Sequence, residues 1–211
     1  AWQSPESLWM DVVKKSPGKA VGYYNLGIIY GDRGLTDKAE QQYLRALQRE
    51  PDYAPAHINL GIIYHAKGNI DMAVKEFETA VKLKPDFAKA RYNLGLVYHS
   101  QGLLDRAIEQ YRIAIKIRPD YAEAHNNLGS AYWAMGRKQD AIKHYQEAVY
   151  LQPHYAQPHY NLGTAYLSIG DLKKATDEFA AAVELAPTNA HAPNTLGVCH
   201  EQGGRVRAGT G

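Results

Sequence analysis

The sequence predicts an all-α protein of the α-solenoid class, in which antiparallel helix pairs stack side by side. A short motif, Asn-Leu-Gly followed three residues later by Tyr, recurs at a constant step of 34 residues without insertion or deletion. Separate columns of glycine, alanine, aromatic residues and proline keep the same step. A fixed period of this length indicates repeated structural units, each of which buries its apolar face against its neighbours.

The motif has five full copies, which begin at Asn25, Asn59, Asn93, Asn127 and Asn161, and a degraded sixth that begins at Thr195. A glycine follows each full copy at Gly34, Gly68, Gly102, Gly136 and Gly170. An aromatic column comes next, at Tyr43, Phe77, Tyr111, Tyr145 and Phe179. Glycine tolerates a positive φ, so we expect the glycine after the motif to form a tight turn between the two helices of a unit.

The period divides the chain into full units between two half units. We expect an N-terminal capping helix, which is a half repeat, over residues 1–19. Full repeats are expected over 20–53, 54–87, 88–121, 122–155 and 156–189. A C-terminal half repeat that also acts as a capping helix is expected over 190–203, followed by a disordered tail over 204–211.

The first of these elements has a well-marked helix start. Ser4 supplies a capping hydroxyl and Pro5 suits the first helical position. Trp9 and Val12 belong to an apolar stripe that we expect to pack on the next helix. Pro17 ends the segment.

The conserved offsets of these columns resemble the tetratricopeptide repeat family, whose unit is a helix–turn–helix with Leu-Gly, Tyr, Ala, aromatic, Ala and Pro at these positions. The resemblance runs from about residue 4 to residue 203. It implies a right-handed superhelix whose first helices line a concave side. It also implies that positions two, five, six, nine and twelve of each unit face inward.

Composition and motifs argue against several classes of function. The chain has 24 basic and 22 acidic residues, a net charge of +2, which gives no reason to expect a nucleic-acid partner. No apolar run reaches the roughly twenty residues that span a bilayer, so no direct membrane contact is expected. Nucleophile-elbow, phosphate-loop and dinucleotide motifs are absent, so we expect a non-catalytic chain without a cofactor. A catalytic domain outside this chain stays open.

Nine histidines raise the question of a metal site. His57, His125 and His159 share the fourth position of their units. Neighbouring units place such side chains on the order of 10 Å apart, the distance between packed helices, which is too far for a shared ion. We expect a structural or surface role for these residues and no metal site.

The inward positions are the candidate peptide-binding surface. The predicted binding residues there are Asn25, Asn59, Asn93, Asn127, Asn161, Tyr24, Tyr92, Tyr160, His65, His99, Trp133 and Lys89. The inward positions as a whole are nearly uncharged, with Lys89 and Glu123 as the exceptions at position two. An asparagine side chain both donates and accepts hydrogen bonds, so a regular row could pair with the main chain of an extended peptide. The same asparagines could equally bond within the fold, because buried amides need partners in either case.

Two further resemblances suggest alternatives. The segment from Ala122 to Gly129 is similar to the repeat region of O-linked N-acetylglucosamine transferases. The segment from Ser7 to Lys19 is similar to the point where membrane glycosyltransferases pass into C-terminal tetratricopeptide repeats. By contrast, the carboxylate clamp of chaperone-binding members matches at only two of five positions, Asn59 and Lys89.

The sequence therefore predicts a protein–protein interaction scaffold that holds a peptide or helical segment of a partner in its concave groove. One alternative is a non-catalytic appendage that presents protein substrates to a glycosyltransferase, which would place it in the periplasm or a lumen rather than the cytoplasm. Another is a self-association module that forms a homo-oligomer through its uncapped ends, where Trp9 or Val198 is left partly exposed.

Overall fold

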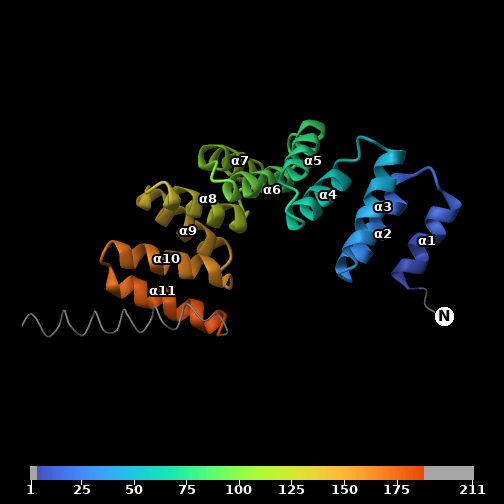
Figure 1. The fold of residues 1–211 in the computed structure, drawn as a ribbon. Coiled ribbons are helices and arrows are strands. Elements are labelled where there is room, and N and C mark those ends of the chain that lie inside the picture. The colour runs from blue at the N-terminus through green and yellow to red at the C-terminus, as the bar shows by residue number, and fades with distance from the viewer. Residues whose placement is uncertain (1–3, 188–211) are drawn as a thin grey trace, which may run out of the picture. The chain divides into compact units, whose positions relative to one another are not determined.

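The structure is a computed structural model that describes residues 4–187 (Figure 1). Within this range it contains helices and no strand. The helices are α1 (Pro5–Lys15), α2 (Ala20–Asp32), α3 (Thr36–Arg49), α4 (Ala54–Ala66), α5 (Ile70–Leu83), α6 (Ala88–Ser100), α7 (Leu104–Ile117), α8 (Ala122–Ala134), α9 (Lys138–Leu151), α10 (Ala156–Ser168) and α11 (Leu172–Leu185). The all-α class predicted from the repeat is therefore confirmed. The C-terminal half repeat and tail predicted over 190–203 and 204–211 lie outside the described residues.

The chain forms two compact units, Ala1–Gln101 and Gly102–Gly211. In the first, α2 packs on α3 and α4 on α5, as Figure 1 shows. In the second, α8 packs on α9 and α10 on α11. The first helices of neighbouring repeats also touch, α4 with α6 and α8 with α10. Neighbouring repeats pack mainly through the second helix of one repeat and the first helix of the next, α3 on α4 and α5 on α6 in the first unit, and α7 on α8 and α9 on α10 in the second.

Turn glycines define the break between the helices of a repeat. Gly34, Gly68, Gly102, Gly136 and Gly170 have φ between 72° and 81°, and no other residue type among those described has a positive φ. This is the left-handed region in which a Cβ atom is unfavourable. The turn geometry predicted from the glycine column is confirmed.

A glycine–aromatic contact closes the helix pairs α2–α3, α4–α5, α8–α9 and α10–α11. A Cβ atom added to Gly61 would lie 2.6 Å from the ring of Phe77, and one added to Gly129 would lie 2.7 Å from the ring of Tyr145. The glycine of the motif therefore lets the aromatic ring of the second helix rest on the backbone of the first. Ten alanines on the second helices are at most 2% exposed: Ala39, Ala46, Ala73, Ala80, Ala107, Ala114, Ala141, Ala148, Ala175 and Ala182.

Helix α1 begins as predicted, with the Ser4 side chain accepting a hydrogen bond from the backbone N–H of Ser7. Val12 packs on α2, since a Cβ added to Gly22 would lie 3.5 Å from its Cγ1 atom. No residue of α1 is fully buried, and Leu8 and Met10 are 50% and 45% exposed. None of the helices between residues 4 and 187 has the length and apolar character needed to cross a membrane.

Candidate peptide-binding surface

The first helices of the first unit carry eight of the predicted binding residues. Lys89 is exposed, and six others are partly buried: Tyr24, Asn25, Asn59, His65, Tyr92 and His99. Asn93 is different, because only 8% of it is exposed. The surface presented by α2, α4 and α6 is therefore half-buried, and Asn93 is the predicted residue with least access to a partner.

The amide of Asn59 bonds inside the fold. It interacts with the hydroxyl groups of Tyr24 and Tyr43. Burial raises the pKa of both tyrosines, and the hydrogen bond to Asn59 lowers it in part. Burial is the largest effect and raises the pKa of Tyr43 to about 12. Asn25 donates from Nδ2 to the backbone oxygen of Val21 at 2.8 Å. Both asparagines thus have partners within their own unit.

Asn93 occupies the same repeat position but its amide nitrogen has no hydrogen-bond partner. Phe77 and Ile58 stand one period after Tyr43 and Tyr24, and neither carries a hydroxyl group. The first repeat offers two tyrosine hydroxyl groups to Asn59. The second repeat offers neither hydroxyl group to Asn93. The change from Tyr43 to Phe77 explains why the Asn93 amide nitrogen has no partner. An unpaired buried amide destabilises a protein by about 1–3 kcal/mol.

In the second unit the inner asparagines bond to each other. Asn161 donates from Nδ2 to Oδ1 of Asn126 at 2.9 Å, between α10 and α8. Gln157 donates to Oδ1 of Asn161 at 3.0 Å. Asn126 in turn donates to Oδ1 of Asn127 at 3.4 Å. This amide chain ties neighbouring repeats together, and Asn126 and Gln157 were not among the predicted binding residues.

Aromatic rings supply the remaining predicted contacts. The Tyr24 ring lies 5.8 Å from that of Tyr43 and 5.2 Å from that of Tyr53. Tyr160 and the partly buried Trp133 belong to the second unit, and the Tyr160 ring lies 5.7 Å from that of Phe179. These contacts fix the orientation of the Tyr24 and Tyr160 rings, and both side chains remain partly exposed.

One cavity opens on this surface, and the sequence analysis did not predict it. It has a volume of about 260 Å³ and lies in the first unit, between α2, α3 and α4. Its rim is formed by Gly31, Thr36, Ile62 and Ala66, which are exposed, and by the half-buried Asn59. Its floor is formed by Ala39, Tyr43 and Ile63, which are buried. Gly31, Asn59 and Ile62 all occupy positions predicted to face inward.

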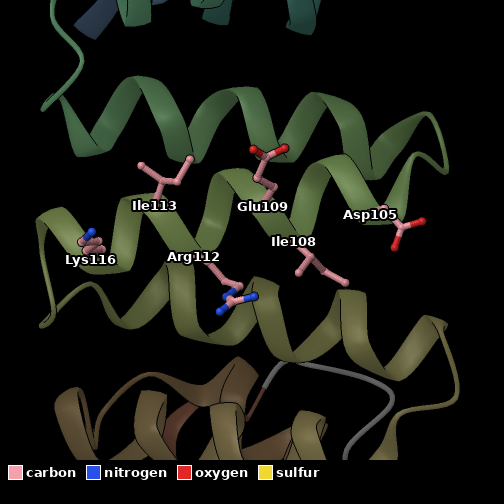
Figure 2. A pocket seen from close by; sticks show the side chains of 6 residues that line it. All are labelled: Asp105, Ile108, Glu109, Arg112, Ile113 and Lys116. Carbon is pink, nitrogen blue, oxygen red and sulfur yellow. The ribbon is translucent and has the colours of Figure 1, made fainter.

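A second hollow, of about 480 Å³, lies along α7 (Figure 2). Its six described lining residues are Asp105, Ile108, Glu109, Arg112, Ile113 and Lys116. Figure 2 shows Glu109 and Ile113 on one side of the helix and Ile108 and Arg112 on the other. The charged side chains are of both signs, and none of the predicted binding residues is among those that line it.

The histidines at the fourth position of the second and fifth repeats contact a glutamate of their own repeat and a proline carbonyl of the preceding repeat. His57 lies 2.6 Å from the Glu76 carboxylate and 2.8 Å from the Pro51 carbonyl oxygen. His159 repeats the arrangement at 2.7 Å from Glu178 and 3.0 Å from the Pro153 carbonyl. Among residues 4–187 no group of three or more histidine, cysteine or acidic side chains could hold a metal ion.

The fourth repeat departs from this arrangement, because His144 stands where a glutamate stands in the second and fifth repeats. The Nδ1 atoms of His125 and His144 are 3.2 Å apart. The pKa of His144 is lowered to about 4, chiefly by burial and in addition by the nearby His125, Lys143 and Arg112. Burial also lowers the pKa of His125. In the second repeat, burial alone would lower the pKa of His57, but its bonds to Glu76 and Pro51 raise it.

Models of known protein families match the repeat region of the chain. Models described as "TPR repeat" match residues 63–102 and 97–136. Models described as "Tetratricopeptide repeat" match 20–53, 122–155, 42–75 and 156–189. No curated protein sequence matches the chain.

Solved structures of several proteins are similar. MamA is 27% identical with a TM-score of 0.67, and the alignment covers 78% of this chain and 96% of that one. YrrB, described as a TPR protein with an unusual peptide-binding site, is 20% identical with a TM-score of 0.70 and coverage of 90% and 98%. PilF of Pseudomonas aeruginosa is 18% identical with a TM-score of 0.78 and coverage of 90% and 92%. The last two show the fold alone.

Helix pairs, turn glycines and the glycine–aromatic contact define a helical-repeat protein of the α-solenoid class. The matched models together run from residue 20 to residue 189. The chain belongs to the tetratricopeptide repeat family.

Proposed function

We propose that the chain is a protein-interaction scaffold and that its first-helix face binds a peptide or helical segment of a partner protein. The observation that carries the proposal is the row of partly exposed aromatic and amide side chains on the first helices, with little charge among them. Rigid aromatic side chains give large contact areas at low entropic cost. The peptide-binding site described for YrrB supports the same use of this fold.

The aromatic rings are the main source of affinity in this proposal. Asn25, Asn59 and Asn161 already have partners within the fold, and Asn93 is buried. Each of these amides still has hydrogen-bonding capacity beyond one bond, because an asparagine offers two donors and an acceptor with two lone pairs. The amides would therefore orient a bound main chain, while Tyr24, Tyr92, Tyr160 and Trp133 provide the contact area. Catalysis and cofactor binding are not part of this role.

A peptide-display selection against the intact chain tests the proposal. Selected peptides are measured by calorimetry against the wild type and a variant with Tyr24→Ala, Trp133→Ala and Tyr160→Ala. The matched control is Tyr150→Ala, which removes an aromatic ring that is 79% exposed on the second helix α9. We expect the triple variant to lose at least about tenfold in affinity, the cost of one well-packed aromatic anchor. The control should stay near the wild type.

Circular dichroism establishes that the triple variant keeps its helix content. If that variant binds the selected peptides as tightly as the wild type, the first-helix face is not the binding surface. A loss confined to Tyr150→Ala would place binding on the second helices and would also contradict the proposal.

A second candidate is a non-catalytic appendage that presents protein substrates to a glycosyltransferase. It rests on the resemblance of the amide-rich segment from Ala122 to Gly129 to the repeat region of O-linked N-acetylglucosamine transferases. The surrounding coding sequence tests it directly. A glycosyltransferase domain in the same open reading frame is the expected result, and an open reading frame without one would reject it.

Self-association is favoured by one feature of α1. Leu8 and Met10 are 50% and 45% exposed on a helix with no buried residue. A second copy would cover this apolar surface. Sedimentation velocity over a hundredfold concentration range should show a concentration-dependent increase in mass that Leu8→Ser abolishes. A strictly monomeric species at every concentration would remove this candidate.

A further inference from the structure

The cavity of about 260 Å³ between α2, α3 and α4 depends on a glycine that neither backbone geometry nor packing explains. Gly31 lies within α2, and its φ is not positive. A Cβ atom added there would meet nothing within 4 Å. Gly61, by contrast, has a ring 2.6 Å from the position of an added Cβ. Glycine inside a helix is destabilising relative to alanine, so Gly31 costs stability without a structural return.

The equivalent position in every other full repeat carries a large side chain. These residues are His65, His99, Trp133 and Leu167. In the first repeat alone, the space that such a side chain would occupy is left empty at the rim of the cavity. Gly31 therefore has one visible effect, which is to keep the cavity open at the inward-facing surface.

The size and lining of the cavity define its occupant. A cavity of about 150 Å³ holds benzene, whereas sites for whole drug-sized ligands start at about 300 Å³. The volume of about 260 Å³ suits one large side chain and not a free metabolite. No lining residue is charged, so a charged occupant would lose its hydration without compensation. The floor stays neutral as well, because burial holds the Tyr43 hydroxyl in its protonated form.

We propose that this cavity is a specificity pocket that receives one branched aliphatic or aromatic side chain of the bound partner segment. Ala39 and Ile63 provide its apolar floor, and Ile62 provides an exposed apolar wall. Thr36 and Asn59 place polar groups at the rim, beside the main chain of an inserted residue. The inference rests on the proposed peptide-binding function and adds a sequence preference that the amide row cannot supply.

The test that needs no partner uses single-residue probes. N-acetyl-leucinamide, N-acetyl-phenylalaninamide and the α-amide of N-acetyl-aspartic acid, whose side-chain carboxylate is free, are titrated to about 50 mM while the methyl groups of Ile62 and Ile63 are followed by NMR. A single side-chain contact without a surrounding peptide binds weakly, so millimolar dissociation constants are expected. The two apolar probes should give saturable shifts at both methyl groups, and the aspartate probe should give none. Absence of saturable shifts with either apolar probe would overturn the pocket.

Two substitutions at one position provide the matched comparison. Gly31→Trp introduces the residue found at the equivalent position of the fourth repeat and should abolish the shifts by filling the pocket. Gly31→Ala also replaces the glycine but adds only a methyl group, so it should retain them. Shifts that persist in Gly31→Trp would show that the probes bind elsewhere, and the inference would fail.

The display peptides separate this inference from the function on which it rests. Burial of one leucine or phenylalanine side chain is worth roughly tenfold to a hundredfold in affinity. Peptides selected by the wild type should share an apolar residue and lose that factor with Gly31→Trp. Peptides that bind the first-helix face but lack such a residue and ignore Gly31→Trp would reject the pocket and leave the proposed function intact. Probes that bind while no peptide does would support the pocket and reject the groove.

Discussion

The paired histidines of the fourth repeat predict an acid-sensitive stability that one substitution should remove. His144→Glu recreates at His125 the histidine–glutamate pair that His57 and Glu76 form at 2.6 Å. Tyr132 stacks on His144 with ring centroids 5.6 Å apart, and Arg112 and Lys143 add positive charge nearby. Protonation of His144 therefore costs stability in the folded protein, whereas a carboxylate at this position would be stabilised by the same surroundings.

The magnitude follows from the pKa of His144, which falls from 6.5 to about 4 on folding. A lowered histidine pKa means that the unfolded chain binds the proton more tightly, so the stability is complete above pH 6.5 and is lost as the pH falls toward 4. At 1.36 kcal/mol per pKa unit the full loss is ~3 kcal/mol, of which ~2 kcal/mol is reached at pH 5. The variant His144→Glu has no histidine at this position and does not lose this stability. Its His125 gains a carboxylate partner that favours the charged imidazole.

Urea unfolding at pH 8 and pH 5, followed by circular dichroism, measures the difference. The wild type should lose about 2 kcal/mol more than His144→Glu over this range. Glu76→His is the reverse control, because it replaces the carboxylate beside His57 and should make the second repeat acid-sensitive. Equal pH dependence of the wild type and His144→Glu would refute the reasoning, as would an NMR titration that places the pKa of His144 above about 6.

Substitutions at four other positions test the packing. Gly129→Ala should lower the free energy of unfolding by ~1–3 kcal/mol in thermal unfolding, because the added methyl meets an aromatic ring at 2.7 Å and a backbone oxygen at 3.1 Å. Gly31→Ala adds its methyl group in open space and should raise the free energy of unfolding by up to ~1 kcal/mol. Equal effects of the two substitutions would contradict the packing argument. Gly68→Ala should cost ~1 kcal/mol and Gly68→Asn less, since asparagine tolerates a φ of 76° better; identical melting temperatures would argue against turn strain. Phe77→Tyr should gain ~1 kcal/mol in urea unfolding by offering Asn93 a hydroxyl partner, and a loss would show that the hydroxyl does not reach the amide.

The fold followed from the sequence because each repeat reuses the same few contacts. The glycine column predicted the interhelical turns, and φ values between 72° and 81° confirm them. The glycine of the motif and the aromatic column were both visible as periodic residues. Their mutual contact was not visible, since periodicity shows which positions matter but not which of them meet.

The candidate site was less predictable because it depends on how columns combine. The asparagine row was evident, but the partner of each asparagine is set by residues in other columns. Asn59 has tyrosine hydroxyls beside it, whereas Asn93 has no partner for its amide nitrogen. The pair formed by His125 and His144 likewise joins two helices, and its Nδ1–Nδ1 distance of 3.2 Å follows only from their packing.

The cavity at Gly31 had a sequence signal that the period alone did not interpret. Gly31 interrupts a column of His65, His99, Trp133 and Leu167. A glycine in a column of large residues indicates either a close contact or an empty space. A Cβ atom added to Gly31 would have no atom within 4 Å, which indicates an empty space.

Photo-crosslinking most directly tests the claim that the first helices form the binding face. A display-selected peptide carrying a benzophenone side chain is irradiated with the intact chain, and the linked residues are mapped by mass spectrometry. Links should fall on α2, α4, α6, α8 or α10, at residues such as Tyr24, Ile62 or Trp133. Links confined to the second helices α3, α5, α7, α9 and α11 would contradict the claim.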